Sequence, residues 1–395
     1  MSYSNFTYSQ QTKLLFGKNA EAATGRLLKE YGASRVLIVT GGSSSRKSGL
    51  LERLTDAITA ENIGWTLYDH CRPNPETRWI DSGAQIYREE KCNFLLAVGG
   101  GSVIDAAKGI AMLTANSGGR IWDYMCNGTE FPNPGSPLGA VLTNAATGSE
   151  CDASFVLSND ETREKLICTN ETCLPRFAVC NPELTYSVGA WQTACGASDT
   201  LSHLLEQYFY TDNTCTASDE MLLGLMKTVV KWCPIALKEP DNYDARANLM
   251  LTSNLAMNGL MGVGHEQNWM THMLEHAVSA VWNHVAHGAG MACLFPCYLE
   301  TIIPQDSLGK IARFGAEVFG IALGKNAAEE AVSALRSFYL QLGMPNTLHG
   351  LVGHVPTKAE LHVVAQKALP WGPAENGGYR QFGEKEVEEL LTAAL

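Results

Sequence analysis

The chain has 395 residues, of which 45% are hydrophobic and 18% are charged, and its formal net charge is −12 at pH 7. A chain of this length exceeds one ordinary hydrophobic core and indicates a soluble globular protein of two domains. Its acidic balance, without a cluster of Lys or Arg, argues against nucleic acid or an anionic membrane surface as a partner.

The beginning of the chain and its cysteines indicate a compartment. A basic stretch followed by an apolar one is missing at the N-terminus, so we expect no signal peptide. The apolar runs are too short to span a bilayer. The twelve cysteines are scattered without a C-x-x-C pair, which is typical of reduced thiols. We therefore expect a cytoplasmic protein.

Strand and helix patterns alternate over the first 180 residues. An edge hairpin is predicted first, with strands at residues 5–8 and 14–16. Apolar runs that are typical of buried parallel strands follow at residues 35–40, 65–68, 94–98 and 138–142. Helical patterns lie between the first of these runs, at residues 48–62, 76–90 and 103–113. Further strands are predicted at residues 155–157, 166–169 and 177–180.

The sequence pattern changes from alternating strands and helices to helices after Asn181-Pro182, since nearly all of the remaining chain has helical periodicity. Alternating strands and helices predict βαβ units and a doubly wound parallel sheet. We therefore predict an α/β domain with a parallel sheet at residues 1–183 and an all-α domain at residues 184–395.

The turn after the first buried strand bears on cofactor choice. It reads Gly41-Gly42-Ser43-Ser44-Ser45-Arg46-Lys47 and contains no carboxylate. Enzymes that prefer NAD(H) commonly place an acidic side chain on the adenosine ribose, where it repels a 2′-phosphate. Hydroxyl donors and cations suit that phosphate instead. The turn predicts NADP(H) over NAD(H), with an ordinary solvated Ser/Gly turn as the alternative.

A glycine-rich turn follows the strand at residues 94–98. Gly99-Gly100-Gly101-Ser102 opens the next predicted helix, and Asp105 and Lys108 lie one turn further on. Glycines allow close approach of a pyrophosphate, and a helix N-terminus offers free N–H groups. Thr147 and Ser149 add hydroxyls at the end of a later strand, where open α/β sheets bind ligands. A tight structural turn is the alternative.

Two pairs of metal-ligating side chains have the spacing of one helix face. Asp199 and His203 are four residues apart in a helical segment, as are His272 and His276. His287 follows in a loop-like stretch. One carboxylate with three imidazoles forms a complete shell for a divalent transition metal. Packed core histidines are the alternative for each residue taken alone.

Taken in order, these motifs resemble a known family. They are Gly99-Gly-Gly-Ser102-Val-Ile-Asp105-Ala-Ala-Lys108, Ala146-Thr-Gly-Ser-Glu150, Asp199-x3-His203, His272-x3-His276 and His287-Gly288. Together they resemble the iron-containing (group III) alcohol dehydrogenases, and within them the butanol dehydrogenase and aldehyde reductase branch. The resemblance covers nearly the whole chain.

The resemblance implies an amino-terminal nucleotide domain, a helical domain, and a metal in the cleft between them. The residues that match the family's metal ligands are Asp199, His203, His272 and His287. Those that match its cofactor contacts are Asn74, Gly100, Gly101, Ser102, Asp105, Thr143, Thr147, Ser149 and Lys165. With Gly42, Ser43 and Ser44 at the 2′-phosphate, they complete the predicted cofactor site. The resemblance also implies Fe(II), although Zn(II) fits the same ligand types, and a homodimer.

The spacing departs from the family's pattern at one point. His272 and His287 are one residue further apart than is usual there, which leaves His284 as an alternative ligand. We favour His287 because Gly288 follows it.

The expected reaction is hydride transfer between a nicotinamide cofactor and a small primary alcohol or aldehyde at the metal. We expect His276 to relay the proton, with a packed histidine as the alternative. A dehydroquinate synthase- or glycerol dehydrogenase-like enzyme of the same fold is the rival function. The dehydroquinate synthase kind usually uses a glutamate as a ligand. A binding protein without catalysis is the third reading, and the full set of ligands argues against it.

Overall fold

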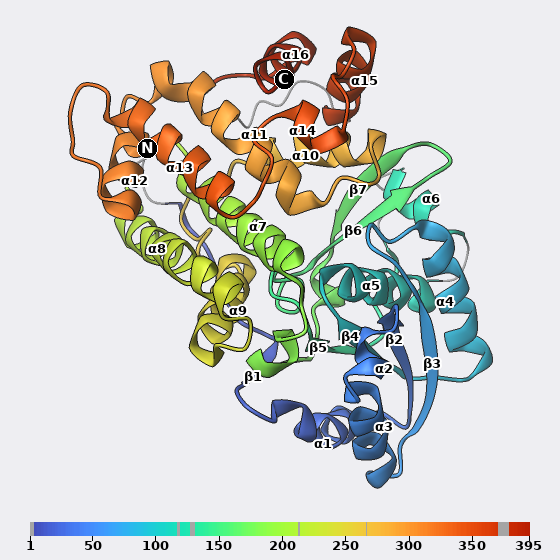
Figure 1. The fold of residues 1–395 in the computed structure, drawn as a ribbon. Coiled ribbons are helices and arrows are strands. Elements are labelled where there is room, and N and C mark those ends of the chain that lie inside the picture. The colour runs from blue at the N-terminus through green and yellow to red at the C-terminus, as the bar shows by residue number, and fades with distance from the viewer. Residues whose placement is uncertain (1–3, 117–118, 127–130, 212–213, 266, 370–378) are drawn as a thin grey trace. The chain divides into compact units, whose positions relative to one another are not determined.

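The computed structural model describes residues 4–116, 119–126, 131–211, 214–265, 267–369 and 379–395. It divides into two compact units. One unit is Ser9–Val188, and the other is Gly189–Leu395 together with the N-terminal residues up to Tyr8. The sheet lies in the first unit and the long helices lie in the second (Figure 1).

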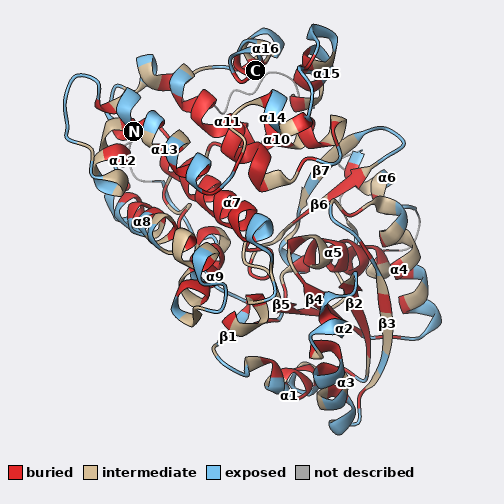
Figure 2. Cartoon of the chain, viewed as in Figure 1, coloured by how far each residue is buried: buried red, intermediate tan, exposed pale blue. Residues whose placement is uncertain are grey.

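Six strands of the described chain form one parallel sheet in the first unit, in the order β1-β8-β5-β4-β2-β3. Their bounds are Lys13–Phe16 for β1, Arg35–Gly41 for β2, Gly64–Cys71 for β3, Phe94–Gly99 for β4, Leu138–Leu142 for β5 and Phe177–Cys180 for β8. The apolar runs form the inner strands because both faces of a parallel sheet are covered. β2, β4 and β5 are almost entirely buried (Figure 2), and every residue of β8 is buried as well. The predicted parallel sheet is confirmed.

Helices cover both faces of this sheet. Val36 and Ile38 of β2 join a buried cluster with residues of α1 and α3 on one face. The alternate residues Leu37 and Val39 point to the other face, where α5 packs against β4 and β2. The helices of this unit are α1 (Thr24–Glu30), α2 (Ser44–Lys47), α3 (Leu50–Ala60), α4 (Thr77–Glu89), α5 (Gly101–Ala115) and α6 (Ile121–Cys126).

The strand predictions at the N-terminus and those between β5 and β8 have different outcomes. The predicted hairpin at the N-terminus is wrong, because residues 5–8 form no strand in the described chain. The strand at 14–16 is present as β1, but it pairs in parallel with β8. Strands β6 (Ser154–Asn159) and β7 (Glu164–Thr169) form a separate antiparallel pair that lies between β5 and β8 in the chain.

The second unit is helical, as its periodicity predicts. Its helices are α7 (Ala190–Tyr208), α8 (Thr216–Lys238), α9 (Tyr243–Met257), α10 (Met270–Val281), α11 (His287–Ile302), α12 (Lys310–Phe319), α13 (Ala327–Gln341), α14 (Leu348–Val352), α15 (Lys358–Ala368) and α16 (Glu384–Ala393). Short 3₁₀ helices are η1 (Ala20–Ala23), η2 (Glu171–Cys173) and η3 (Pro182–Thr185) in the first unit and η4 (Ile303–Gln305) in the second. None of the helices in the described residues is long and apolar enough to cross a membrane.

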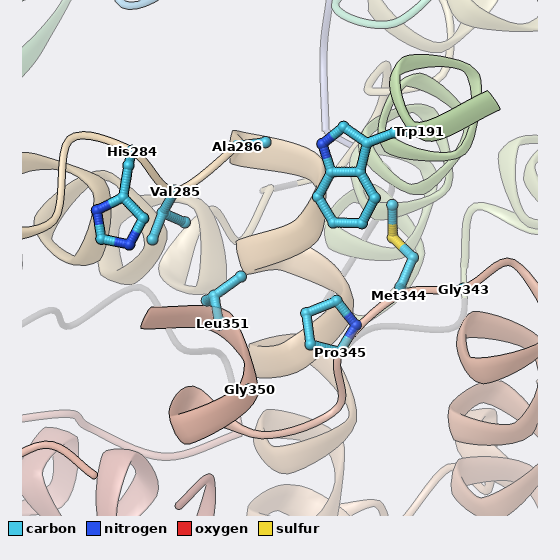
Figure 3. A pocket seen from close by; sticks show the side chains of 9 residues that line it. All are labelled: Trp191, His284, Val285, Ala286, Gly343, Met344, Pro345, Gly350 and Leu351. Carbon is cyan, nitrogen blue, oxygen red and sulfur yellow. The ribbon is translucent and has the colours of Figure 1, made fainter. Parts of the chain in front are cut away.

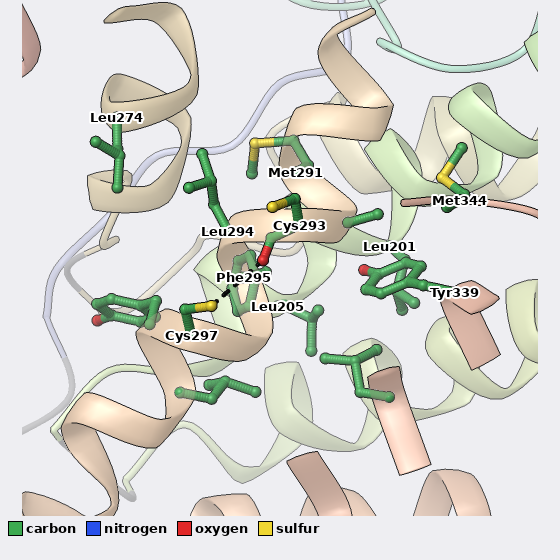
Figure 4. Close-up of a cluster of buried hydrophobic side chains, with 14 of the residues drawn as sticks. Leu201, Leu205, Leu274, Met291, Cys293, Leu294, Phe295, Cys297, Tyr339 and Met344 are labelled. Atoms are coloured by element: carbon green, nitrogen blue, oxygen red, sulfur yellow. Dashed lines mark hydrogen bonds between the residues drawn. The ribbon is translucent and has the colours of Figure 1, made fainter. Parts of the chain in front are cut away.

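Helix α11 forms the centre of the helical core. Its residues from Gly288 to Leu299 are all buried. Figure 4 shows Met291, Cys293, Phe295 and their neighbours on α11 among side chains from α7, α10 and α13. The Cys297 thiol donates to the carbonyl of Cys293 at 3.5 Å, so this pair packs within the core. Because α11 is packed on all sides, it cannot shift easily, and the position of its first residue, His287, is fixed.

Candidate active site

Three imidazoles converge on one carboxylate oxygen in the helical unit. Asp199 and His203 lie one turn apart on α7, His272 lies on α10, and His287 is the first residue of α11. The Nε2 atoms of His287, His203 and His272 lie 3.3, 3.6 and 4.0 Å from Asp199 Oδ1. Asp199 is 3% exposed, and its Oδ1 lacks a well-formed hydrogen bond within the described residues. The structure therefore brings all four predicted metal ligands together.

Two buried glutamates orient two of these rings. Glu206 Oε1 lies 3.1 Å from His272 Nδ1 and also accepts from the backbone N–H of His272 at 2.9 Å. Glu275 contacts Nδ1 of His287 through Oε2. Both glutamates are 0% exposed. A partner on Nδ1 fixes the ring and leaves Nε2 as the atom that faces Asp199, an arrangement common around protein-bound metals.

The charges at the centre shift the ionisation of these groups. Burial disfavours the charged form of Asp199, but the charges of His203 and His287 outweigh it and hold its pKa below its usual range. Burial likewise disfavours charged His287, whereas Glu275 and Asp199 raise the pKa of His287 to about 9. Burial raises the pKa of Glu206 well above its ordinary value. The charge of Asp199 thus interacts with the imidazoles of all three histidines.

The donor set fits a divalent cation. Four N or O ligands at about 2.0–2.1 Å from one ion, at tetrahedral angles, lie roughly 3.3–3.5 Å apart. The nearest nitrogen–oxygen distances around Asp199 Oδ1 are close to this value. Asp199, His203 and His272 can each offer one ligand atom within 4.8 Å of the others. His287 falls instead in a second such group, with Glu275 and His276, although its Nε2 lies 3.3 Å from Asp199 Oδ1 of the first group.

Glycines allow α11 to approach its neighbours at this point. A Cβ on Gly288 would lie 2.0 Å from the carbonyl oxygen of Cys195, which is one turn before Asp199 on α7. A Cβ on Gly290 would lie 2.6 Å from Cγ of Glu275. Glycine at both positions is therefore needed to bring His287 to Asp199 and Glu275, because even an alanine methyl group would clash.

The two remaining histidines of the central motif have different places. The ring of His276 is 5.3 Å from that of His287, measured between centroids. His284 is exposed and lines a pocket of about 410 Å³ with Trp191, Met344 and Leu351 (Figure 3). His284 is absent from every group of potential metal ligands in the described chain. The geometry favours His287 over His284 as the fourth ligand.

The glycine-rich turn of the sheet unit has the expected shape. β4 ends at Gly99, Gly100 caps α5, and Gly101 is the first residue of that helix. A Cβ on Gly101 would lie 2.5 Å from the Thr147 side chain, and one on Gly100 would lie 3.1 Å from Cβ of Asn144. The glycines let the segment after β5 lie against the start of α5.

Asp105 and Ser149 are engaged with each other. Ser149 Oγ donates to Asp105 Oδ1 at 2.6 Å, and the N–H of Val156 donates to Oδ2 at 3.1 Å. Burial raises the pKa of Asp105 to about 6. Lys108, 0% exposed, donates at 2.7–2.9 Å to Asp152 and to the Ser154 carbonyl. These side chains connect α5 to the loop that carries Thr147.

The other predicted cofactor residues lie at the ends of neighbouring elements. Thr143 follows β5, and its N–H donates to the carbonyl of Gly99 at 2.9 Å. Asn74 has a φ of +53°, and the next residue, Pro75, accepts from the N–H of Ser158 at 2.9 Å. Ser158 pairs with Lys165 across the β6–β7 hairpin. The turn that carries Asn74 is therefore connected to the hairpin that carries Lys165.

The turn after β2 is open to solvent. Gly42, Ser43 and Ser44 are exposed, and Gly42 has a φ of +48°. Ser45 is buried, and its hydroxyl lies 3.1 Å from that of Thr40. This contact holds the turn against the end of β2, while the predicted 2′-phosphate contacts stay accessible to solvent.

Comparison with known proteins identifies the family. A family model described as "Iron-containing alcohol dehydrogenase" matches residues 11–182, and a model for the "Fe-containing alcohol dehydrogenase family, C-terminal" matches residues 193–395. The chain belongs to the iron-containing alcohol dehydrogenases.

Relatives within this family are similar to the chain over most or all of their length. NADH-dependent butanol dehydrogenase B of Clostridium acetobutylicum is 37% identical, covering 99% of this chain and 100% of the relative. The NADPH-dependent aldehyde reductase YqhD of Escherichia coli is 36% identical over 88% of this chain and 90% of its own. The solved structure of NADH-dependent butanol dehydrogenase A from Thermotoga maritima has a TM-score of 0.93 at 29% identity, and 100% of each chain is covered.

The sequence reasoning missed the two buried glutamates of this iron-containing alcohol dehydrogenase. Glu206 lies three residues after His203, and Glu275 lies three residues after His272. Acidic residues at helical spacing from a ligand are the signal that was available. Their pairing with rings of other helices, however, depends on how α7, α10 and α11 pack.

The approach of α11 to α7 yields a prediction. Gly288→Ala places a methyl group against the backbone of Cys195, so α11 has to move and carry His287 away from Asp199. We expect metal affinity to fall roughly ten- to hundredfold, as when the supports of metal ligands are altered. Metal per chain after dialysis, measured by mass spectrometry, tests this.

A helical glycine with open surroundings provides the control. Gly224 on α8 is exposed, and nothing lies within 4 Å of its added Cβ. Gly224→Ala should leave the metal content unchanged. Full metal binding by the Gly288→Ala protein would contradict the role given to this contact.

Proposed function

We propose that the chain interconverts small primary alcohols and aldehydes, using a nicotinamide cofactor and a divalent metal. The observation that carries this proposal is the convergence of three Nε2 atoms on Asp199 Oδ1. Family membership and relatives named butanol dehydrogenase or aldehyde reductase support the same reaction.

The proposed metal ligands are Asp199, His203, His272 and His287. Fe(II) is favoured by the family, and Zn(II) fits the same donors. When bound, such an ion acts as a Lewis acid that lowers the pKa of an alcohol and polarises an aldehyde. Asp199 supplies one negative charge, which limits the positive charge of the loaded site. Glu206 and Glu275 hold the rings so that little reorganisation is needed on binding.

The nucleotide contacts are proposed for the first unit. The N-terminus of α5 offers the free N–H groups of Gly101 and Ser102 to a pyrophosphate. Gly100 keeps the backbone accessible there, and Thr143 and Thr147 frame the turn. Since Asp105 and Ser149 already bond each other, we assign them to shaping this turn. Asn74 and Lys165 lie on connected segments and are the remaining proposed contacts.

Turnover and metal content together test the proposed function. The native chain, reconstituted with Fe(II) or Zn(II), should oxidise NADPH or NADH over many turnovers with butanal. Asp199→Ala and His272→Ala should each lose the metal and nearly all turnover, because each removes one of four ligands. Conversion of a sugar-phosphate-like acid without net cofactor oxidation would favour the dehydroquinate synthase-like alternative.

Two other histidines serve as contrasts in the same assay. His276→Ala should keep the metal and lower turnover, with partial rescue by free imidazole, if His276 relays the proton. His349→Ala should change neither quantity, since His349 is exposed on α14 and belongs to no group of potential metal ligands in the described chain. Unchanged turnover in the His276 variant would remove the relay from the mechanism.

We further propose that NADP(H) is preferred over NAD(H). The exposed hydroxyls of Ser43 and Ser44 and the backbone at Gly42 are the proposed 2′-phosphate contacts. Relatives named for each cofactor exist, so the preference has to be measured for this chain. Hydrogen bonds to a charged phosphate contribute roughly 1.5–3 kcal/mol each.

The preference can be inverted at Ser43. Ser43→Asp should shift the ratio of kcat/KM for NADPH over NADH by tenfold or more toward NADH, at about 1.4 kcal/mol per factor of ten. Ser333→Asp, at an exposed position on α13, is the control and should leave the ratio unchanged. A native preference for NADH would contradict the proposal.

A homodimer in the cytoplasm is also proposed. β1 lies at one edge of the sheet, where unpaired backbone groups favour pairing with a second copy. Sedimentation equilibrium of the native chain should give twice the chain mass of 42.8 kDa. A monomer at micromolar concentration would contradict this proposal.

A further inference from the structure

An ion pair lies beside the turn proposed for the 2′-phosphate. Arg46, on α2, donates to Asp69 Oδ2 at 2.8 Å. Asp69 is on β3, and this strand pairs with β2 up to Gly41 and Cys71, where the turn begins. The turn has no carboxylate of its own in the sequence, but the fold supplies one from the neighbouring strand.

The pair changes the charge that the turn presents. Arg46 and Lys47 are the turn's two cations, and Asp69 offsets one of them. Arg72 lies nearby and donates to the backbone carbonyls of Asp69 and Cys71 at 3.3 and 2.8 Å. The hydrogen bond from Arg46 lowers the pKa of Asp69, so this carboxyl is ionised at neutral pH.

Both partners remain partly open to solvent. The Arg46 and Asp69 side chains are 51% and 40% exposed. An exposed ion pair is weak, so a better anion can take the guanidinium from it. A phosphate is such an anion, since its hydrogen bonds with arginine are often bidentate.

We propose that Asp69 is a specificity-determining residue that competes with the cofactor's 2′-phosphate for the guanidinium of Arg46. This inference rests on the proposed function, because it concerns the cofactor of the same site. NADPH has to displace Asp69 from Arg46, whereas NADH, which has no 2′-phosphate, does not. Asp69 therefore lowers the affinity for NADPH relative to NADH, although the turn as a whole still favours NADP(H).

Binding of both cofactors to four proteins tests the competition. These are the native chain, Asp69→Asn, Arg46→Ala and the double variant, with dissociation constants measured by cofactor fluorescence. Asp69→Asn should tighten NADPH binding about threefold to tenfold, in line with a released exposed pair, and leave NADH within about twofold. Arg46→Ala should weaken NADPH binding. In its background, Asp69→Asn should have no further effect, because the contested guanidinium is gone.

The matched control is an ion pair at the start of β2, the strand that ends at the turn with Arg46. Arg35, the first residue of β2, pairs with Glu90 at the exposed surface. Seven residues of strand separate the two ends by about 20 Å, beyond the screening length at physiological salt. Glu90→Gln removes the same charge and should leave both dissociation constants unchanged.

The outcomes separate this inference from the proposed function. If both cofactors bind the native chain and Asp69→Asn leaves their ratio unchanged, competition for Arg46 is overturned while the proposed function stands. The same holds if Asp69→Asn tightens NADPH binding equally with and without Arg46, because Asp69 would then act by direct repulsion. If neither cofactor binds the native chain, both proposals fail.

Discussion

The structure of the helical unit depends on the burial of one carboxylate among three imidazoles. A buried charge is costly unless opposite charges and polar partners surround it, and Asp199 is 3% exposed. The three imidazoles that surround it come from α7, α10 and α11. Gly288 and Gly290 let α11 come close enough, and Glu206 and Glu275 orient the rings. Glutamates contact Nδ1 of His272 and of His287, so the Nε2 atoms of both rings can face a cation beside Asp199, which is why we propose a metal at this site.

In the sheet unit, by contrast, the proposed cofactor contacts come from backbone and turn geometry. Parallel strands end at one edge, and their following turns gather there. Buried side chains such as Lys108 and Asp105 fix these turns. Few charged groups are then needed at the cofactor itself. A single exposed pair, Arg46 with Asp69, can therefore have a measurable effect on cofactor choice.

Much of this organisation follows from local sequence patterns. Apolar runs placed the inner strands, and the spacing of Asp199 with His203 placed these two predicted ligands on one helix, α7, because both patterns depend on near neighbours. The N-terminal hairpin was predicted wrongly, since β1 pairs with β8, which is more than 160 residues away. Glu206, Glu275 and Asp69 were missed for the same reason. Each acts on a residue of another element, and sequence spacing does not encode that contact.

The central claim is that Asp199, His203, His272 and His287 bind one divalent ion. X-ray absorption spectroscopy of the Zn(II)-loaded chain tests it most directly, together with metal stoichiometry. We predict one ion per chain and only N and O ligands at about 2.0–2.2 Å, with the scattering pattern of three imidazoles. A sulfur ligand at about 2.3 Å, for instance from nearby Cys195, would contradict this account. So would a site with fewer than three imidazoles.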